Sequence, residues 1–146
     1  MGTCLARGWG GVPKDAEAAL KWYELAVSGG YRSGEFSIAY LLLHEDILAS
    51  RRHEAVGWLQ QSSVGVSIWT LASIYEKGEI VPRDLSAALH CWEQALSYPR
   101  HGDWVEKKVQ SLRLAIAAET LHTTAQQRQL VAAKELGRLK VDGVSD

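Results

Sequence analysis

Apolar and polar residues follow one another along this chain with the spacing of amphipathic helices. The segments 38–42 and 71–75 each place apolar residues at positions that share one face of a helix. The segment 103–121 has the same kind of stripe, with apolar residues four, seven and eleven positions after Val105. A further segment, 124–139, favours helix with a thinner apolar stripe that Gly137 interrupts. The pattern predicts an all-α protein with about seven or eight helices.

The chain also repeats itself. Asp15 precedes the pattern Ala-Ala-Leu-x-Trp-Tyr-Glu-x-Ala, and Asp84, 69 residues later, precedes Ala-Ala-Leu-x-Cys-Trp-Glu-x-Ala. This shift is twice the length of a helix-pair repeat of about 34 residues. A third copy is therefore expected between the two, and the run from Ala55 to Leu59 fits it.

Each copy contains residues with a definite structural role. Gly8 and Gly78 are expected to end the first helix of a pair, because glycine adopts the left-handed conformation without strain. Asp15 and Asp84 are expected to cap the second helix by accepting hydrogen bonds from its first N–H groups. The middle copy lacks this aspartate, and Ser50 is its expected cap. The residues expected to pack between helices are the alanines Ala19, Ala26, Ala88 and Ala95 and the tryptophans Trp22 and Trp58.

The pattern Leu-Ala-x-x-Tyr-x-x-Gly, followed by Val-Pro-x-Asp, resembles the Sel1-like repeat, a branch of the tetratricopeptide superfamily. The resemblance covers residues 1–97 in three copies. The first copy is truncated at its N-terminus, since Met1 aligns with Leu71 inside a helix, so we expect a piece of a longer repeat array. The resemblance implies a right-handed α-solenoid of stacked antiparallel helix pairs. Residues 98–140 are predicted to form a C-terminal helical extension or cap of two helices, and 141–146 a frayed tail.

Proteins of this superfamily mostly act as adaptors and scaffolds, and the first helix of each pair lines their concave face. The resemblance therefore implies a non-catalytic module that binds a protein or peptide partner through Arg7, Phe36, Tyr40, His44, Trp69, Ser73 and Lys77. Aromatic side chains beside cationic ones suit an extended or helical peptide with a carboxylate or two. Phe36 and Trp69 could instead pack between helices.

Two other functions remain open at this stage. One is a regulatory or immunity-type protein that masks the surface of an effector. The other is a hydrolase, an activity proposed for cysteine-rich relatives of this repeat, although the paired cysteines are lacking here. Cys91 aligns with Trp22 and is predicted to be a packing residue. The five histidines and two cysteines show no metal-ligand spacing, so no metal or cofactor is predicted.

Net charge and hydropathy indicate which classes of binding partner are not expected. A net charge of −1 gives no field that draws the protein to nucleic acid or to an anionic membrane. No apolar run reaches the length of about 20 residues that crosses a bilayer, and the start lacks a signal-peptide pattern. The cytoplasm is therefore the default location, and the actual compartment stays unknown. Self-association through the open N-terminal end is left as an option.

Overall fold

The computed structural model describes residues 2–7, 14–99 and 102–144. All regular structure in these ranges is helical, which confirms the all-α prediction. The α-helices are α1 (Gly2–Arg7), α2 (Ala16–Ser28), α3 (Gly34–His44), α4 (Glu54–Gln61), α5 (Gly65–Lys77), α6 (Leu85–Ala95) and α7 (Asp103–Val144). One 3-10 helix, η1 (Asp46–Arg51), lies between α3 and α4.

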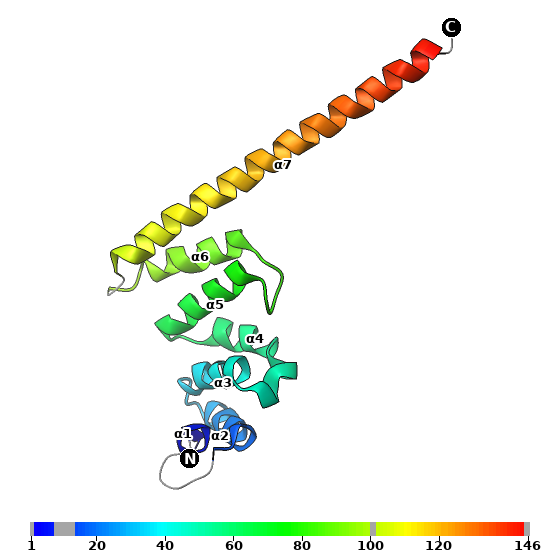
Figure 1. The fold of residues 1–146 in the computed structure, drawn as a ribbon. Helices are drawn as coiled ribbons and strands as arrows, with labels where there is room; N and C mark the ends of the chain where they lie inside the picture. The colour runs from blue at the N-terminus through cyan, green and yellow to red at the C-terminus, as the bar shows by residue number, and fades with distance from the viewer. Residues whose placement is uncertain (1, 8–13, 100–101, 145–146) are drawn as a thin grey trace.

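Successive helices pack on one another and form a stack (Figure 1). The pairs are α1 with α2, α3 with α4 and α5 with α6, and each pair packs against the next. The first half of α7 packs on α6, and its second half continues beyond the stack, so the two ends of the chain lie at opposite ends of the molecule (Figure 1). This arrangement is an α-solenoid, as the repeat pattern predicted.

A core of small and medium apolar side chains runs through the stack. Alanine lets two helix backbones approach closely, and larger residues such as Ile38 and Leu42 fill the space on either side. Ala26, at an equivalent position near the end of α2, is only half-buried. The fully buried alanines are Ala19, Ala39, Ala55, Ala72, Ala88 and Ala95.

Asp15 and Asp84 cap α2 and α6 in the same geometry. The Oδ1 atom of Asp15 accepts a hydrogen bond from the backbone N–H of Ala18 at 3.0 Å, and that of Asp84 accepts one from Ala87 at 2.9 Å. The backbone angles of the two caps agree within a degree, with φ −140° and ψ 97° at the first and φ −139° and ψ 96° at the second. The two helices therefore begin in the same way, although 69 residues separate them.

Gly78 ends α5 in the left-handed conformation, with φ +69°. A Cβ atom at this position would lie 3.0 Å from the backbone nitrogen of Arg83, so any side chain would strain the turn. The loop that follows is closed by a hydrogen bond from the N–H of Asp84 to the carbonyl oxygen of Tyr75, 2.9 Å long. The equivalent Gly8 lies outside the described residues.

The prediction that Ser50 caps the second helix of the middle copy is wrong. Ser50 lies within η1, and α4 begins at Glu54 without a side-chain cap. A bidentate ion pair stabilises this start instead, because Arg51 donates to both carboxylate oxygens of Glu54, at 2.9 and 2.8 Å. These hydrogen bonds hold the pKa of Glu54 below its ordinary value and raise the pKa of Arg51.

Glu54→Gln is expected to lower the free energy of unfolding by less than about 1 kcal/mol at neutral pH, because the ion pair is partly exposed to water. Since the pKa of Glu54 is lowered in the folded state, the contribution of the pair is present above the ordinary carboxyl pKa. It is lost as the pH falls through the folded pKa. Urea unfolding at neutral and at acidic pH measures this: the difference between wild type and variant should shrink in acid. An equal difference at both pH values would contradict the assignment.

Trp22 lies at the surface, which corrects its predicted packing role. Its side chain is 47% exposed, whereas Trp58 is half-buried and Cys91 is only 6% exposed. Cys91 lines a hollow together with Leu59 and Gln60 at the end of α4, the second helix of the preceding pair. Among the described residues, no helix pair precedes the pair of α1 and α2 and could cover Trp22. Trp22 and Cys91 are therefore buried to different extents, although their sequence positions are equivalent.

The C-terminal region forms one helix, so the prediction of two helices is wrong. α7 has 42 residues, contains Gly137 without interruption and includes residues 141–144, which were expected to fray. No residue near position 122 ends the helix, and threonine is accommodated there. The hydroxyls of Thr120, Thr123 and Thr124 each donate to the backbone carbonyl oxygen four residues earlier.

Candidate functional site

Two neighbouring hollows lie along the side of the stack built by the first helix of each pair, which we call the first-helix face. One hollow, of about 240 Å³, lies between α1, α2 and α3. The other, of about 480 Å³, lies between α3, α5 and the loop after α5. The helix α3 contributes residues to both hollows. All seven predicted binding residues line them: Arg7, Phe36 and Tyr40 in the first, and His44, Trp69, Ser73 and Lys77 in the second.

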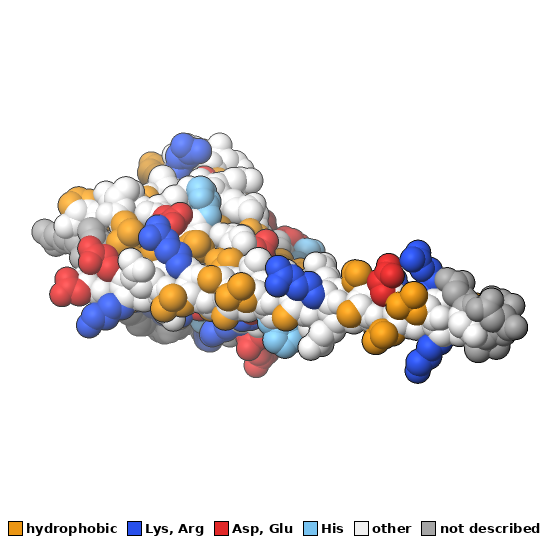
Figure 2. Space-filling model, turned by 90° about the horizontal axis from the view of Figure 1, so that it is seen from above, with side chains coloured by type: hydrophobic (Ala, Val, Ile, Leu, Met, Phe, Trp, Pro, Cys, Tyr) orange, Lys and Arg blue, Asp and Glu red, His pale blue; other side chains and the backbone are white. Residues whose placement is uncertain are grey.

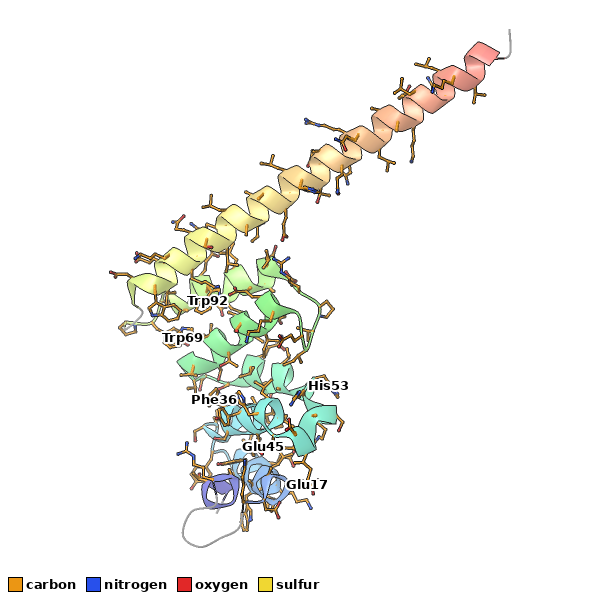
Figure 3. All side chains as sticks on the ribbon, viewed as in Figure 1. Glu17, Phe36, Glu45, His53, Trp69 and Trp92 are labelled. Carbon is orange, nitrogen blue, oxygen red and sulfur yellow. The ribbon has the colours of Figure 1, made fainter. Side chains whose placement is uncertain are left out.

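A row of rings on α3 connects the two hollows. Phe36, Tyr40 and His44 are spaced by four residues, so they lie one above another on the same face of the helix. The ring centroids are 6.3 Å apart in the first pair and 4.4 Å apart in the second. Phe36 lies on the same side of the stack as Trp69 and Trp92 (Figure 3). Tyr40 is 51% exposed, so this ring can contact a ligand directly.

Trp69, at the edge of the larger hollow, belongs to a cluster of three indoles. Trp104 packs edge-to-face against Trp69 at a centroid distance of 5.6 Å and against Trp92 at 5.4 Å. The indole N–H of Trp92 donates to Glu76 at 2.7 Å, and Lys108 binds the same carboxylate at 2.6 Å. These contacts join α5, α6 and α7, and they hold Trp69 in place.

Trp104 is the residue of this region that sequence reasoning missed. It is 50% exposed and lies in the first turn of α7, beyond the last repeat copy. Its only sequence signal is an aromatic side chain beside the amphipathic stripe that begins at Val105. Which indoles it contacts depends on how α7 packs across α5 and α6, and this cannot be derived from the local pattern.

The charges around the two hollows are mixed, with cations beside the aromatic rings. Arg7 lines the smaller hollow and Lys77 the larger one. Glu45 also lines the smaller hollow, but its carboxylate binds Lys14 at 2.8 Å. Glu79 lines the larger hollow beside Lys77.

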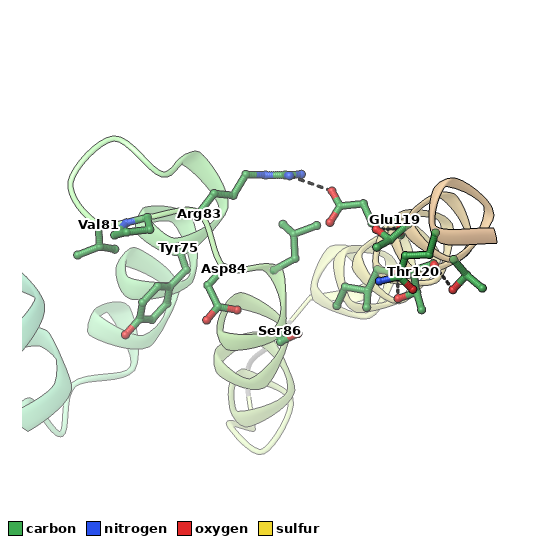
Figure 4. Close-up of a pocket in the computed structure, with 13 residues that line it drawn as sticks. Tyr75, Val81, Arg83, Asp84, Ser86, Glu119 and Thr120 are labelled. Carbon is green, nitrogen blue, oxygen red and sulfur yellow. Dashed lines mark hydrogen bonds and ion pairs between the residues drawn. The ribbon is translucent and has the colours of Figure 1, made fainter. Parts of the chain in front are cut away.

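A larger hollow, of about 820 Å³, lies elsewhere, between the loop before α6 and the middle of α7 (Figure 4). Arg83 binds Glu119 across it at 2.8 Å. Several of its other polar groups have structural partners, because Asp84 caps α6 and its three threonine hydroxyls donate to the backbone of α7. This hollow therefore has few polar groups with which to bind a ligand.

The described cysteine, Cys91, is poorly placed to act as a nucleophile. Cys91 lies in the core, and burial raises the pKa of its thiol, so the thiolate needed by a nucleophile is disfavoured. The imidazole of the adjacent His90 contacts the side-chain amide of Gln94 at 3.0 Å. Within residues 2–7, 14–99 and 102–144, no three histidine, cysteine or acidic side chains form a metal-binding group. None of the described helices combines the length and hydropathy needed to cross a membrane.

The fold and the first-helix face define a helical-repeat protein of the solenoid class. The family model of the Sel1 repeat matches residues 1–31 and 67–97. The chain is therefore similar to Sel1 repeats at these two sites, in agreement with the resemblance seen in the sequence. The match does not include the middle pair, α3 and α4, whose place in the repeat array is given by the stacking of the helices.

A solved structure supports the same fold. The chain is similar to the crystal structure of a Sel1 repeat protein from Oxalobacter formigenes, with a TM-score of 0.56 and 23% sequence identity. The similarity covers 66% of this chain and 40% of the other, so this chain spans less than half the length of that protein. No curated protein matches the sequence. Sel1 repeats are generally modules of protein–protein interaction.

Proposed function

We propose that this protein is a non-catalytic interaction module that binds a peptide segment of a partner protein on the first-helix face. One observation carries the proposal: the seven residues selected from the sequence line two adjoining hollows. A row of rings on α3 lies between these hollows. Side chains from three first helices thus lie along the first-helix face.

The chemistry of this surface indicates the kind of segment it binds. Tyr40 and Trp69 are rigid aromatic groups, which contribute strongly to interfaces because little conformational entropy is lost when they bind. Lys77 lies at the far end of the larger hollow, on the last turn of α5, where it can pair with a carboxylate. The partner segment is therefore an extended or helical peptide that places an apolar side chain in the larger hollow and an acidic group near Lys77.

The double variant Tyr40→Ala with Lys77→Ala tests the proposal. Both side chains are exposed, so the melting temperature should change little, while binding of the partner should weaken by at least about tenfold. The partner is first identified by affinity purification from source cells followed by mass spectrometry. Its affinity for the purified chain is then measured by isothermal titration calorimetry.

Lys21→Ala with Tyr31→Ala is the matched control. It removes the same two residue types from exposed positions that do not line either hollow, and Tyr31 is 72% exposed. This control should bind the partner with unchanged affinity. If both double variants bind as the wild type does, the partner binds elsewhere and the proposed face is wrong.

A further inference from the structure

α7 has apolar residues on two opposite faces. One face is buried against the stack and includes Val105, Val109 and Leu112. The second face begins with Leu114, two residues after the buried Leu112. Because two residues along a helix rotate the side chain by about 200°, Leu114 points away from the stack. We call this second face the outer stripe; its residues recur every three or four positions or after seven. They are Leu114, Ala118, Leu121, Ala125, Ala132, Leu136 and Leu139.

The outer stripe is exposed along its whole length. Leu114 is 72% exposed and Leu121 is 71% exposed, although both lie in the half of α7 nearest the stack. These two leucines are therefore exposed because they point away from the stack. They are not exposed merely because α7 extends beyond it. Hydrophobic side chains gather along α7 on the face seen from above (Figure 2). A helix that is apolar on two opposite faces is typical of one packed between two neighbours.

We propose that a second copy of this chain covers the outer stripe, with the two α7 helices antiparallel. In an antiparallel pair centred near position 123, Leu114 lies opposite Ala132 of the second copy and Leu121 lies opposite its Ala125. Large side chains thus meet small ones at the centre of the contact, which is the arrangement that lets two helices interdigitate closely. Each copy contains both members of each of these pairs, so the stripe is complementary to itself.

Arg128 decides between the two directions of pairing. It lies on the line of the stripe between Ala125 and Ala132 and is exposed. A parallel pair in register would place the two Arg128 side chains against each other, and like charges repel. The antiparallel pair places Arg128 opposite Ala118, with the second Arg128 about 15 Å further along the axis. Antiparallel helix dipoles also attract one another.

The size of the contact sets the expected strength of the dimer. Residues 107–139 would overlap over about 48 Å, which with a helix about 10 Å wide gives a footprint near 500 Å² on each copy. Stable interfaces use about 800 Å² from each partner. The contact is therefore at the low end, and the dissociation constant should be on the order of micromolar.

Sedimentation velocity of the complete chain over a range of concentrations tests the pairing. The wild type should shift from monomer to dimer, and Leu114→Asp with Leu121→Asp should remain a monomer with an unchanged circular dichroism spectrum. The matched control is Leu130→Asp with Val141→Asp. These residues are also exposed on α7 but lie on the opposite side of the helix, so the control should dimerise like the wild type.

Three results would overturn the proposal. They are a wild type that stays monomeric at every concentration, a control that loses the dimer equally, and a dimer that survives in Leu114→Asp with Leu121→Asp. The last result would indicate self-association through another surface, such as the N-terminal end of the stack.

The direction of pairing has its own test. Chains carrying Leu114→Cys and chains carrying Ala132→Cys, with Cys4 replaced by serine in both, are mixed and oxidised. A disulfide-linked pair of the two different chains should form faster than a pair of either chain with itself. Faster linkage of Leu114→Cys with itself would overturn the antiparallel arrangement.

Discussion

Trp92→Ala is expected to lower the free energy of unfolding by about 3–5 kcal/mol, the range for removing a buried aromatic side chain. Trp92 is 6% exposed, donates its indole N–H to Glu76 and packs against Trp104. Its loss therefore leaves a cavity between α5, α6 and α7 and removes the hydrogen bond to Glu76. Unfolding in urea, followed by circular dichroism at 222 nm, measures the change.

Trp22→Ala is the control for this prediction. It removes the same side chain from a position that is 47% exposed. Its effect on the free energy of unfolding should be less than half that of Trp92→Ala, because much of the indole is already in water. Equal effects of the two substitutions would contradict the assignment of Trp92 to the core and of Trp22 to the surface.

Leu42→Ala is expected to lower the free energy of unfolding by about 2–5 kcal/mol. Leu42 is fully buried in α3, in the middle pair that the Sel1 repeat match does not include. In a repeat stack each pair is stabilised by its neighbours, so a weakened middle pair should also uncouple the two ends. Hydrogen exchange should then show faster exchange in α3 and α4, and unfolding in urea should lose cooperativity.

Leu25→Ala provides the comparison for Leu42→Ala. Leu25 lies in α2 with 65% of its surface exposed, so the same substitution there should change the free energy of unfolding by less than about 1 kcal/mol. If Leu42→Ala left both the stability and the exchange pattern unchanged, the middle pair would not link the two Sel1 repeats as the stack indicates.

The candidate site was predicted from the sequence through the repeat alignment. Because α1, α3 and α5 are equivalent helices, residues at matching positions were expected to share one face, and the seven selected residues do line adjoining hollows. Trp104 was missed because it follows the last repeat copy, and its contacts with Trp69 and Trp92 arise from the packing of α7. Whether this face binds a partner is decided by the variants of Tyr40 and Lys77.

Features that depend on neighbouring residues were determined by the sequence itself. Asp15 and Asp84 each cap a helix through an N–H group three residues ahead, and Gly78 ends a helix through its own backbone angles. Such interactions need no distant partner, so a local motif is sufficient to predict them. The fold class followed from the repetition of these motifs along the chain.

The tertiary structure alone decided how much each side chain is buried. Trp22 and Cys91 occupy equivalent repeat positions, yet among the described residues only Cys91 has a preceding helix pair beside it. Burial depends on helices that are distant in the sequence, and their presence or absence cannot be read from a single repeat.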